Sequence, residues 1–174
     1  MSTQPTILVV DDETELTDLY ATWVGDSYDV LTAYDGRSAL EQLTDEVDIV
    51  LLDRHMPDLT GDEVLEEIRR RGHDCWVIMV TAVDPGLDIV ALDIDDYVTK
   101  PVTRSQLTRI IDTLRVQSRY LQDGRRELQA LSNKKDTLED ELTMEELEGT
   151  ETYQQLEDEL GKLGESLGDG FEEA

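Results

Sequence analysis

The stretch Val47-Asp48-Ile49-Val50-Leu51-Leu52-Asp53 is an apolar run that ends on an acidic residue. Three other short apolar runs also end on polar residues: 6–10 before Asp11 and Asp12, 76–80 before Thr81, and 96–99 before Lys100. In a parallel α/β sheet the carboxyl ends of the strands lie along one edge, and ligands bind there. If these runs are strands of such a sheet, three carboxylates, one hydroxyl and one ammonium group meet in a single cleft.

Amphipathic segments alternate with these runs up to about residue 119. Residues 13–24 carry Leu16, Leu19, Tyr20 and Trp23 at helical spacing. The remaining elements are read in the same way: a strand over 28–32, helices over 38–43 and 61–71, a short helical segment over 87–92, and a helix capped by Thr103. Five strands that alternate with five helices predict an α/β fold, a doubly wound parallel sheet with helices on both faces.

The composition is strongly acidic. The 174 residues include 42 Asp and Glu against 15 Lys and Arg, which gives a net charge of −27. Such a charge opposes compaction at low ionic strength and is screened at about molar salt, where the Debye length is ~3 Å. We therefore expect a protein from a salt-adapted organism with a salt-rich cytoplasm. The alternative is an ordinary acidic protein with a disordered tail, but the acid excess is present in both halves of the chain.

The composition argues against several classes of protein, namely disulfide-bonded, cysteine-metal, membrane-spanning and secreted proteins. The single cysteine, Cys75, excludes an internal disulfide and a cysteine-built metal site. No stretch approaches the ~18 apolar residues of a membrane span, so we expect no membrane partner. The residues 1–5 lack the basic region of a signal peptide. A cytoplasmic location is the simplest expectation.

The pattern changes near residue 120. No later run resembles a strand, and leucines recur at helical spacing, for example at Leu156, Leu160 and Leu163. Leucines also recur every seven residues at 107, 114, 121 and 128. With breaks expected at 132–133 and 148–150, we predict a domain over 1–119, a small all-α hairpin or coiled-coil extension over 120–167, and a disordered tail over 168–174. A solvated helical tail without a specific partner is the alternative.

The acidic cleft suits a divalent cation and a phosphoryl group. Mg²⁺ prefers hard oxygen ligands, which Asp11, Asp12 and Asp53 provide. Three neighbouring carboxylates repel one another, so a metal ion and Lys100 are needed to keep them ionised. An ionised Asp53 is then a nucleophile for phosphoryl transfer.

Four motifs resemble those of the response-regulator receiver domain of two-component signalling. They are VVDDE at 9–13, LLDRHMPDLTG at 51–61, VTA at 80–82 and DDYVTKP at 95–101. The resemblance covers residues 5–118 and implies a flavodoxin-like sheet of five parallel strands in the order 2-1-3-4-5. It also implies a phosphoacceptor that catalyses only its own phosphoryl uptake and hydrolysis, rather than an enzyme with other substrates.

The resemblance implies roles for the residues of these motifs. Asp53 would be the phosphoacceptor for a cognate sensor histidine kinase in a phosphorelay. Asp12, Asp53 and the backbone carbonyl of His55 would bind Mg²⁺ directly, with Asp11 acting through water. A haloacid-dehalogenase-like phosphatase also uses an aspartate nucleophile, but it needs a second aspartate where this chain has His55.

The resemblance further implies a switch. Thr81 would bond a phosphoryl oxygen, Lys100 would pair with the acyl phosphate, and the bond before Pro101 would be cis. Thr81 would move toward the phosphoryl group and Tyr97 would fill the vacated space; the alternative is that Tyr97 is only a core residue. The segment between Thr81 and Lys100 is short for the family, which puts in doubt dimerisation through its fourth helix.

The residues from about 120 resemble the HalX domain, a helical module that follows receiver domains in haloarchaea. Ser132-Asn133-Lys134-Lys135 and Glu151-Thr152-Tyr153 carry this resemblance. Residues 120–174 contain 17 acidic and 5 basic side chains, whereas a DNA-binding module presents a basic face, so we do not expect direct DNA binding. An unknown output protein or a homodimer through these helices is expected instead. The alternatives are a transcriptional regulator whose helical module contacts DNA or the transcription machinery, and a catalytic output.

Overall fold

The computed structural model describes residues 4–120 and 123–171, and the side chains of 4–116 and 126–166. Its centre is a parallel sheet of five strands in the order β2-β1-β3-β4-β5. The strands are β1 (Thr6–Val10), β2 (Asp29–Ala33), β3 (Ile49–Leu52), β4 (Trp76–Thr81) and β5 (Asp96–Thr99). The predicted fold class and strand order are confirmed.

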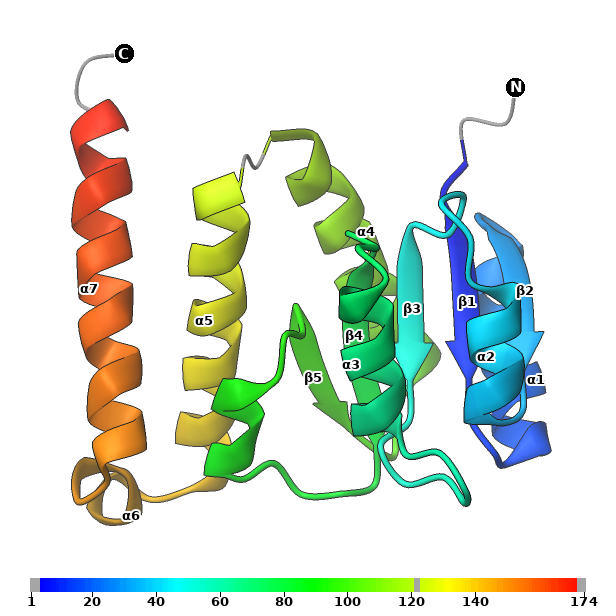
Figure 1. Ribbon diagram of the computed structural model, residues 1–174, viewed down its shortest axis with the longest axis horizontal. Coiled ribbons are helices and arrows are strands. Elements are labelled where there is room, and N and C mark those ends of the chain that lie inside the picture. Colours follow the sequence, from blue (N-terminus) through cyan, green and yellow to red (C-terminus); the bar gives the residue numbers. More distant parts are fainter. Residues whose placement is uncertain (1–3, 121–122, 172–174) are drawn as a thin grey trace.

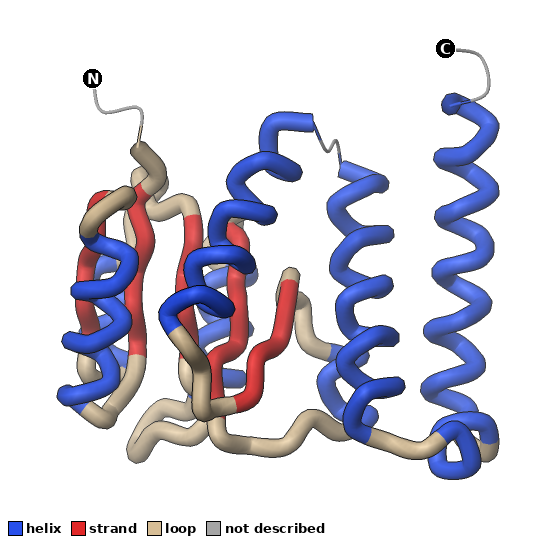
Figure 2. The backbone as a smooth tube through the Cα atoms, turned by 180° about the vertical axis from the view of Figure 1, so that it is seen from behind, coloured by secondary structure: helices blue, strands red, loops and turns tan. Residues whose placement is uncertain are grey.

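Alternation along the strands divides the apolar core between the two faces of the sheet. Ile7 and Val9 of β1 point to one face, which α1 (Thr14–Gly25) and α4 (Arg104–Tyr120) cover. Leu8 and Val10 point to the other, which α2 (Gly36–Gln42) and α3 (Gly61–Arg70) cover. Figure 1 shows α2 and α3 in front of the sheet, and Figure 2 shows α1 and α4 on the reverse side. Helices therefore lie on both faces of the sheet, as a parallel sheet requires.

The connection between β4 and β5 departs from regular alternation. It contains only the 3₁₀ helix η1 (Leu87–Ala91), in agreement with the short helical segment expected there but not with five full helices. The helix α5 (Asp123–Glu141) packs against both η1 and β5. Its Leu131 and Leu138 are buried in the same apolar cluster as Val77 and Met79 of β4. A helix from beyond the receiver motifs thus completes the cover of this face.

The C-terminal helices form a hairpin, as expected. After α5 the chain turns through α6 (Met144–Glu148) and returns as α7 (Glu151–Phe171), which runs antiparallel to α5 (Figure 1). A capping box at Thr143 and Glu146 starts α6. Leu147, Tyr153 and Leu156 are buried in the apolar cluster that also contains residues of α5 and of the sheet. The turn therefore belongs to the packed structure.

Some expectations for this region need correction. The break expected at 132–133 is wrong: α5 continues through it, because the Asn133 side chain donates to the carbonyl oxygen of Asp95. The break at 148–150 is confirmed. The seven-residue leucine series does not follow one helix: 107 and 114 lie on α4 and 128 on α5, while 121 lies outside the described residues. Of the tail expected over 168–174, residues 168–171 continue α7, and 172–174 lie outside the described residues.

Candidate phosphoacceptor and metal site

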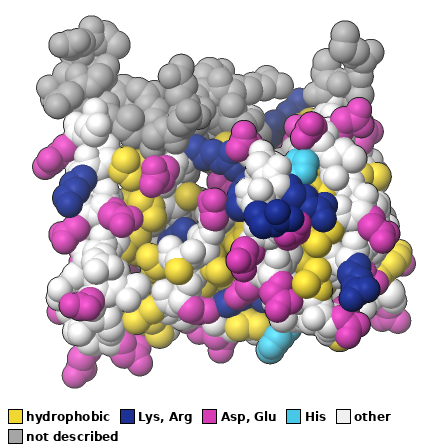
Figure 3. All heavy atoms as spheres, in the orientation of Figure 1, with side chains coloured by type: hydrophobic (Ala, Val, Ile, Leu, Met, Phe, Trp, Pro, Cys, Tyr) yellow, Lys and Arg dark blue, Asp and Glu magenta, His cyan; other side chains and the backbone are white. Residues whose placement is uncertain are grey.

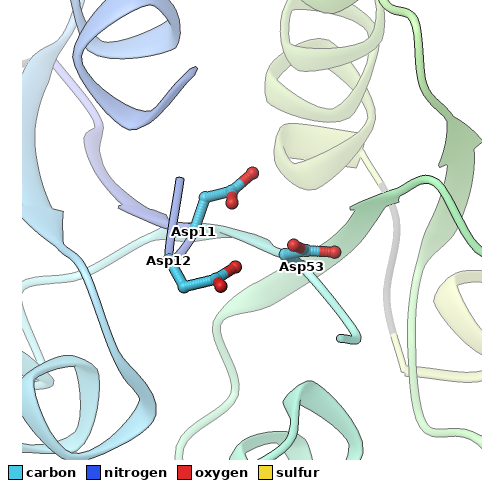
Figure 4. A group of neighbouring side chains, drawn as sticks. All are labelled: Asp11, Asp12 and Asp53. Atoms are coloured by element: carbon cyan, nitrogen blue, oxygen red, sulfur yellow. The ribbon is translucent and has the colours of Figure 1, made fainter. Parts of the chain in front are cut away.

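The carboxyl ends of β1 and β3 bring the three aspartates together. The two strands are neighbours, with Val10 paired to Leu52. The ladder continues past the strands, since the Asp53 backbone N–H donates to the Val10 carbonyl over 3.1 Å. One carboxylate oxygen from each of Asp11, Asp12 and Asp53 lies within 4.8 Å of the others, and the three groups face a common space (Figure 4). The predicted cluster of acids is present.

Lys100 supplies the positive charge of the cluster. Its Nζ lies 2.6 Å from Asp11 Oδ2 and 3.4 Å from Asp53 Oδ2. The backbone places it there, because the Lys100 N–H donates to the Thr81 carbonyl over 2.8 Å, and the Lys100–Pro101 bond is cis as expected. Burial lowers the pKa of Lys100, but the bond to Asp11 and the charge of Asp53 outweigh it and raise the pKa overall. The ammonium group therefore stays charged between the two acids.

The aspartates differ in their exposure to water. Asp11 and Asp53 are 2% and 5% exposed, whereas Asp12 is more open. Burial, reinforced by the charge of Asp53, raises the pKa of Asp11 to about 6, although the bonds from Lys100 and from the Glu13 backbone oppose this shift. A buried anionic cluster is costly without further cations. Hard oxygen ligands with one open side suit a hydrated divalent ion such as Mg²⁺.

Two features hold the acidic loops in place. The buried Thr17 of α1 donates its hydroxyl to the Asp11 carbonyl over 2.7 Å, and the Glu13 backbone N–H donates to Asp11 Oδ1 over 3.0 Å. On the other side, a Cβ at Gly61 would collide with the carbonyl oxygen of Asp53. Glycine is thus required where α3 starts against the end of β3. Sequence reasoning did not single out Thr17; a polar residue on the inner face of a helix was the available signal.

Thr81 at the end of β4 and Tyr97 on the neighbouring strand β5 are both bonded to Val83. Thr81 is fully buried, and its Oγ1 accepts from the Val83 backbone N–H over 3.3 Å. Tyr97 is 5% exposed, and its hydroxyl donates to the Val83 carbonyl over 2.6 Å. Val83 therefore links the two residues that the family resemblance implies as a switch pair.

His55 and Arg54 follow Asp53 directly. The side chain of His55 is exposed, and its backbone N–H lies 3.4 Å from Asp53 Oδ1. The Arg54 side chain is 11% exposed and binds acids of α3 and η1. Sequence reasoning missed Arg54, although an arginine next to a buried acid in an acid-rich protein was a usable signal.

The chain matches the profile of the response regulator receiver domain over residues 7–112 and therefore belongs to that family. Residues 119–173 match the HalX domain, so the suspected two-part architecture is confirmed. Solved relatives share the fold. A response regulator receiver domain from Clostridium thermocellum is 29% identical, with a TM-score of 0.60 over 68% of this chain and 99% of that one. A CheY-like receiver domain from Methanospirillum hungatei is 27% identical, with a TM-score of 0.60 over 67% and 98%.

Curated relatives extend beyond this chain. A putative transcriptional regulator from Haloferax volcanii is 46% identical over 155 residues, which cover 88% of this chain and 26% of the relative. The regulatory protein VanRc from Enterococcus gallinarum is 38% identical over 120 residues, or 66% of this chain and 52% of that protein. The matches thus span about a quarter and about half of these relatives. None of the helices in the described residues is long and apolar enough to cross a membrane.

Proposed function

We propose that this response regulator accepts a phosphoryl group on Asp53 from a cognate sensor histidine kinase and works in the cytoplasm. The observation that carries the proposal is the position of Asp53. Its carboxylate is almost buried, lies with Asp11 and Asp12 within 4.8 Å, and is 3.4 Å from the Lys100 ammonium. A nucleophile, a cation and two further hard ligands therefore share one cleft.

The donor set fits Mg²⁺. Asp12, Asp53 and the His55 backbone carbonyl would bind the ion directly, and Asp11 would hold it through water. Bound there, Mg²⁺ would neutralise charge on the phosphoryl oxygens. Lys100 is already oriented toward the same space through its contact with Asp11.

In the proposed transfer, an Asp53 carboxylate oxygen attacks phosphorus as the P–N bond of the donor phosphohistidine breaks. The imidazole leaves with the bonding electrons and takes up a proton. Lys100 pairs with the phosphoryl oxygens, and Thr81 donates its hydroxyl to one of them. Such transfer depends mainly on in-line positioning and charge neutralisation.

The switch in this proposal runs through Thr81 and Tyr97. A phosphoryl group adds roughly −1.5 to −2 charge and new acceptor oxygens. Thr81 would turn its hydroxyl away from Val83 toward them, and Tyr97 would move into the vacated space. The bonds of both residues to Val83 support this coupling, because a change at one alters the partner of the other.

The test is phosphorylation by acetyl phosphate in molar KCl with and without Mg²⁺. We expect a hydroxylamine-sensitive label that depends on Mg²⁺ and is lost in Asp53→Asn. Asp58→Asn is the matched control, because Asp58 lies in the same loop, is exposed, and has a positive φ that asparagine tolerates. A label that persists in Asp53→Asn, or its absence from the wild-type protein, contradicts the proposal.

The output is proposed separately. The named relative from Haloferax volcanii favours a role in transcription. The acid excess of residues 120–174 favours contact with an unidentified output protein, or with a second copy of the chain, over direct contact with DNA. A pull-down in molar salt with and without beryllofluoride, followed by sizing, separates these partners. A DNA complex in a salt-dependent gel shift supports the direct alternative.

A further inference from the structure

The guanidinium of Arg54 joins three elements at one point. Its Nε and Nη2 each lie 2.9 Å from an oxygen of Asp62 on α3, and Nη2 lies 2.6 Å from Asp88 Oδ2 on η1. Its Nη1 is 3.5 Å from the hydroxyl of Tyr97 on β5, and the guanidinium carbon is 5.9 Å from the centre of that ring. The planar fork of arginine makes several directed bonds possible, which a lysine ammonium cannot reproduce.

This point is connected to the phosphoacceptor side by two short routes. Arg54 is the next residue after Asp53 in the chain. In space, its partner Tyr97 donates to the Val83 carbonyl, and the Val83 N–H donates to Thr81. A charge added at Asp53, or a movement of Thr81, therefore alters the surroundings of Arg54 within a few bonds.

On the other side, η1 connects to the C-terminal helices. Ile89 of η1 is fully buried, and it belongs to the apolar cluster that contains Leu131 and Leu138 of α5 and Leu156 of α7. The buried Lys134 of α5 donates to the Val90 carbonyl over 3.4 Å. A shift of η1 would therefore change the packing of α5 and α7 as well.

We propose that Arg54 is a positioning residue that couples phosphorylation of Asp53 to the seating of η1, and through η1 to α5 and α7. The inference rests on the proposed function of Asp53. In the structure Arg54 holds η1 through Asp88. When the phosphoryl charge appears at the adjacent residue and Tyr97 leaves Val83, the guanidinium is drawn from Asp88, its most exposed acidic partner at 59%. The helix η1 is then free to shift, and α5 and α7 shift with it.

The experiment measures hydrogen exchange of the full chain in molar KCl with Mg²⁺, with and without beryllofluoride. Peptides covering 85–95 and 126–141 report on η1 and α5. In the wild-type protein we expect beryllofluoride to change their exchange rates by about fivefold or more, the lower range of site-to-site coupling. In Arg54→Lys, which keeps the charge but not the fork, we expect the change to fall below about twofold. Labelling of Asp53 by acetyl phosphate should persist in this variant.

Arg70→Lys is the matched control, because Arg70 is an exposed arginine of α3 whose described contacts are with Glu67. It should respond as the wild-type protein does. A merely structural Arg54 would change exchange equally with and without beryllofluoride and leave the difference intact, which overturns the proposal. The coupling proposal also fails if the wild-type protein is phosphorylated by acetyl phosphate but shows no change in hydrogen exchange. If the wild-type protein is not phosphorylated at all, the proposed function of Asp53 fails instead.

Asp88→Asn tests the same bridge from the η1 side if Arg54→Lys fails to fold. Asp88 is exposed, so this variant disturbs the core little. The expected result is a reduced exchange response with labelling intact. An unchanged response in a folded Asp88→Asn contradicts the role of the bridge.

Discussion

Asp95 and Asp96 are adjacent acids at the start of β5. Both are at least partly buried, but their carboxylates have different bonding partners. Asp95 is 4% exposed and binds Arg126 over 3.0 Å, the Val77 backbone N–H over 2.9 Å, and Arg69 at 3.5 Å. The described hydrogen bond of Asp96 is to the backbone N–H of Tyr97. Burial raises the pKa of Asp96 to about 6, with the charge of Asp95 adding to the effect. Asp95 therefore anchors α5, whereas the charge of Asp96 opposes the fold.

Replacement of Asp96 by asparagine should stabilise the protein at neutral pH. Because its pKa is raised in the folded state, protonated Asp96 favours folding below about pH 4, and this contribution is lost as pH rises through about 6. Asp96→Asn should therefore match the wild type at pH 4.5 more closely than at pH 7.5. At pH 7.5 the free energy of unfolding of Asp96→Asn should exceed that of the wild type by about 1–2 kcal/mol. This gain is smaller than the full pKa shift of Asp96 implies, because Asp96 is half-buried.

Urea unfolding in molar KCl at several pH values measures this difference. Asp84→Asn, at an exposed loop position, is the control and should differ from the wild type by a constant amount. A constant difference for Asp96→Asn over the same range would show that its burial carries no electrostatic cost.

At the scale of elements, α5 takes the place of a helix that the receiver part lacks. The connection from β4 to β5 contributes only η1, and the exposed apolar face that would result is covered by Leu131 and Leu138. Arg126 of α5 adds a polar anchor: it stacks over the Trp76 ring at 4.3 Å and bonds Asp95. The receiver and HalX segments therefore share one core.

Leu138→Ala tests this shared core. Leu138 is fully buried, so its truncation should cost about 2–5 kcal/mol. Because both tryptophans, Trp23 and Trp76, lie in the receiver segment, tryptophan fluorescence should report the loss as a lower midpoint of urea unfolding. Val116→Ala, at a 57% exposed position of α4, should change stability by less than about 0.5 kcal/mol. If the fluorescence midpoint of Leu138→Ala stays at the wild-type value while its circular dichroism signal is lost at lower urea, the two segments unfold independently and do not share one core.

At the scale of the whole molecule, the large negative charge is the feature that most affects stability. The net charge is −27, and Figure 3 shows Asp and Glu side chains scattered over the visible face, with a group of Lys and Arg near its centre and others dispersed around it. This arrangement spreads the repulsion over the surface instead of concentrating it in one tail. Repulsion of this kind weakens a compact state unless counterions screen it. We propose salt adaptation on this basis.

Stability should therefore rise with salt. Between 0.1 and 1 M KCl the Debye length falls from about 10 to about 3 Å. We expect a gain of about 2 kcal/mol or more, which corresponds to a rise in Tm of about 4–8 °C at this chain length. Thermal unfolding by circular dichroism measures it. A triple variant with Asp140→Asn, Glu141→Gln and Asp158→Asn, all at exposed helix positions, should be more stable than the wild type at 0.1 M and less sensitive to salt. An equal response of both proteins would attribute the effect to salt exclusion rather than screening.

The acidic site and the sheet could be predicted because each depends on local patterns. Alternating elements set the parallel sheet, and the strand ends place Asp11, Asp53 and Lys100 at one edge. Arg54 could not be assigned in this way, because its partners Asp62 and Asp88 come from elements that meet only after packing. The continuity of α5 through Asn133 was missed for the same reason: its amide finds an acceptor on Asp95 only in the folded chain.

The order of residues alone determined that the chain forms a five-stranded doubly wound sheet with a carboxylate cluster at its edge. Such features follow from periodicity and from where polar residues end apolar runs. Only the tertiary structure decided that α5 would cover the face beside η1 and that one arginine would tie three elements together. Burial and directed bonds between segments far apart in the chain select these arrangements, and a linear pattern does not specify which apolar stripe meets which uncovered face.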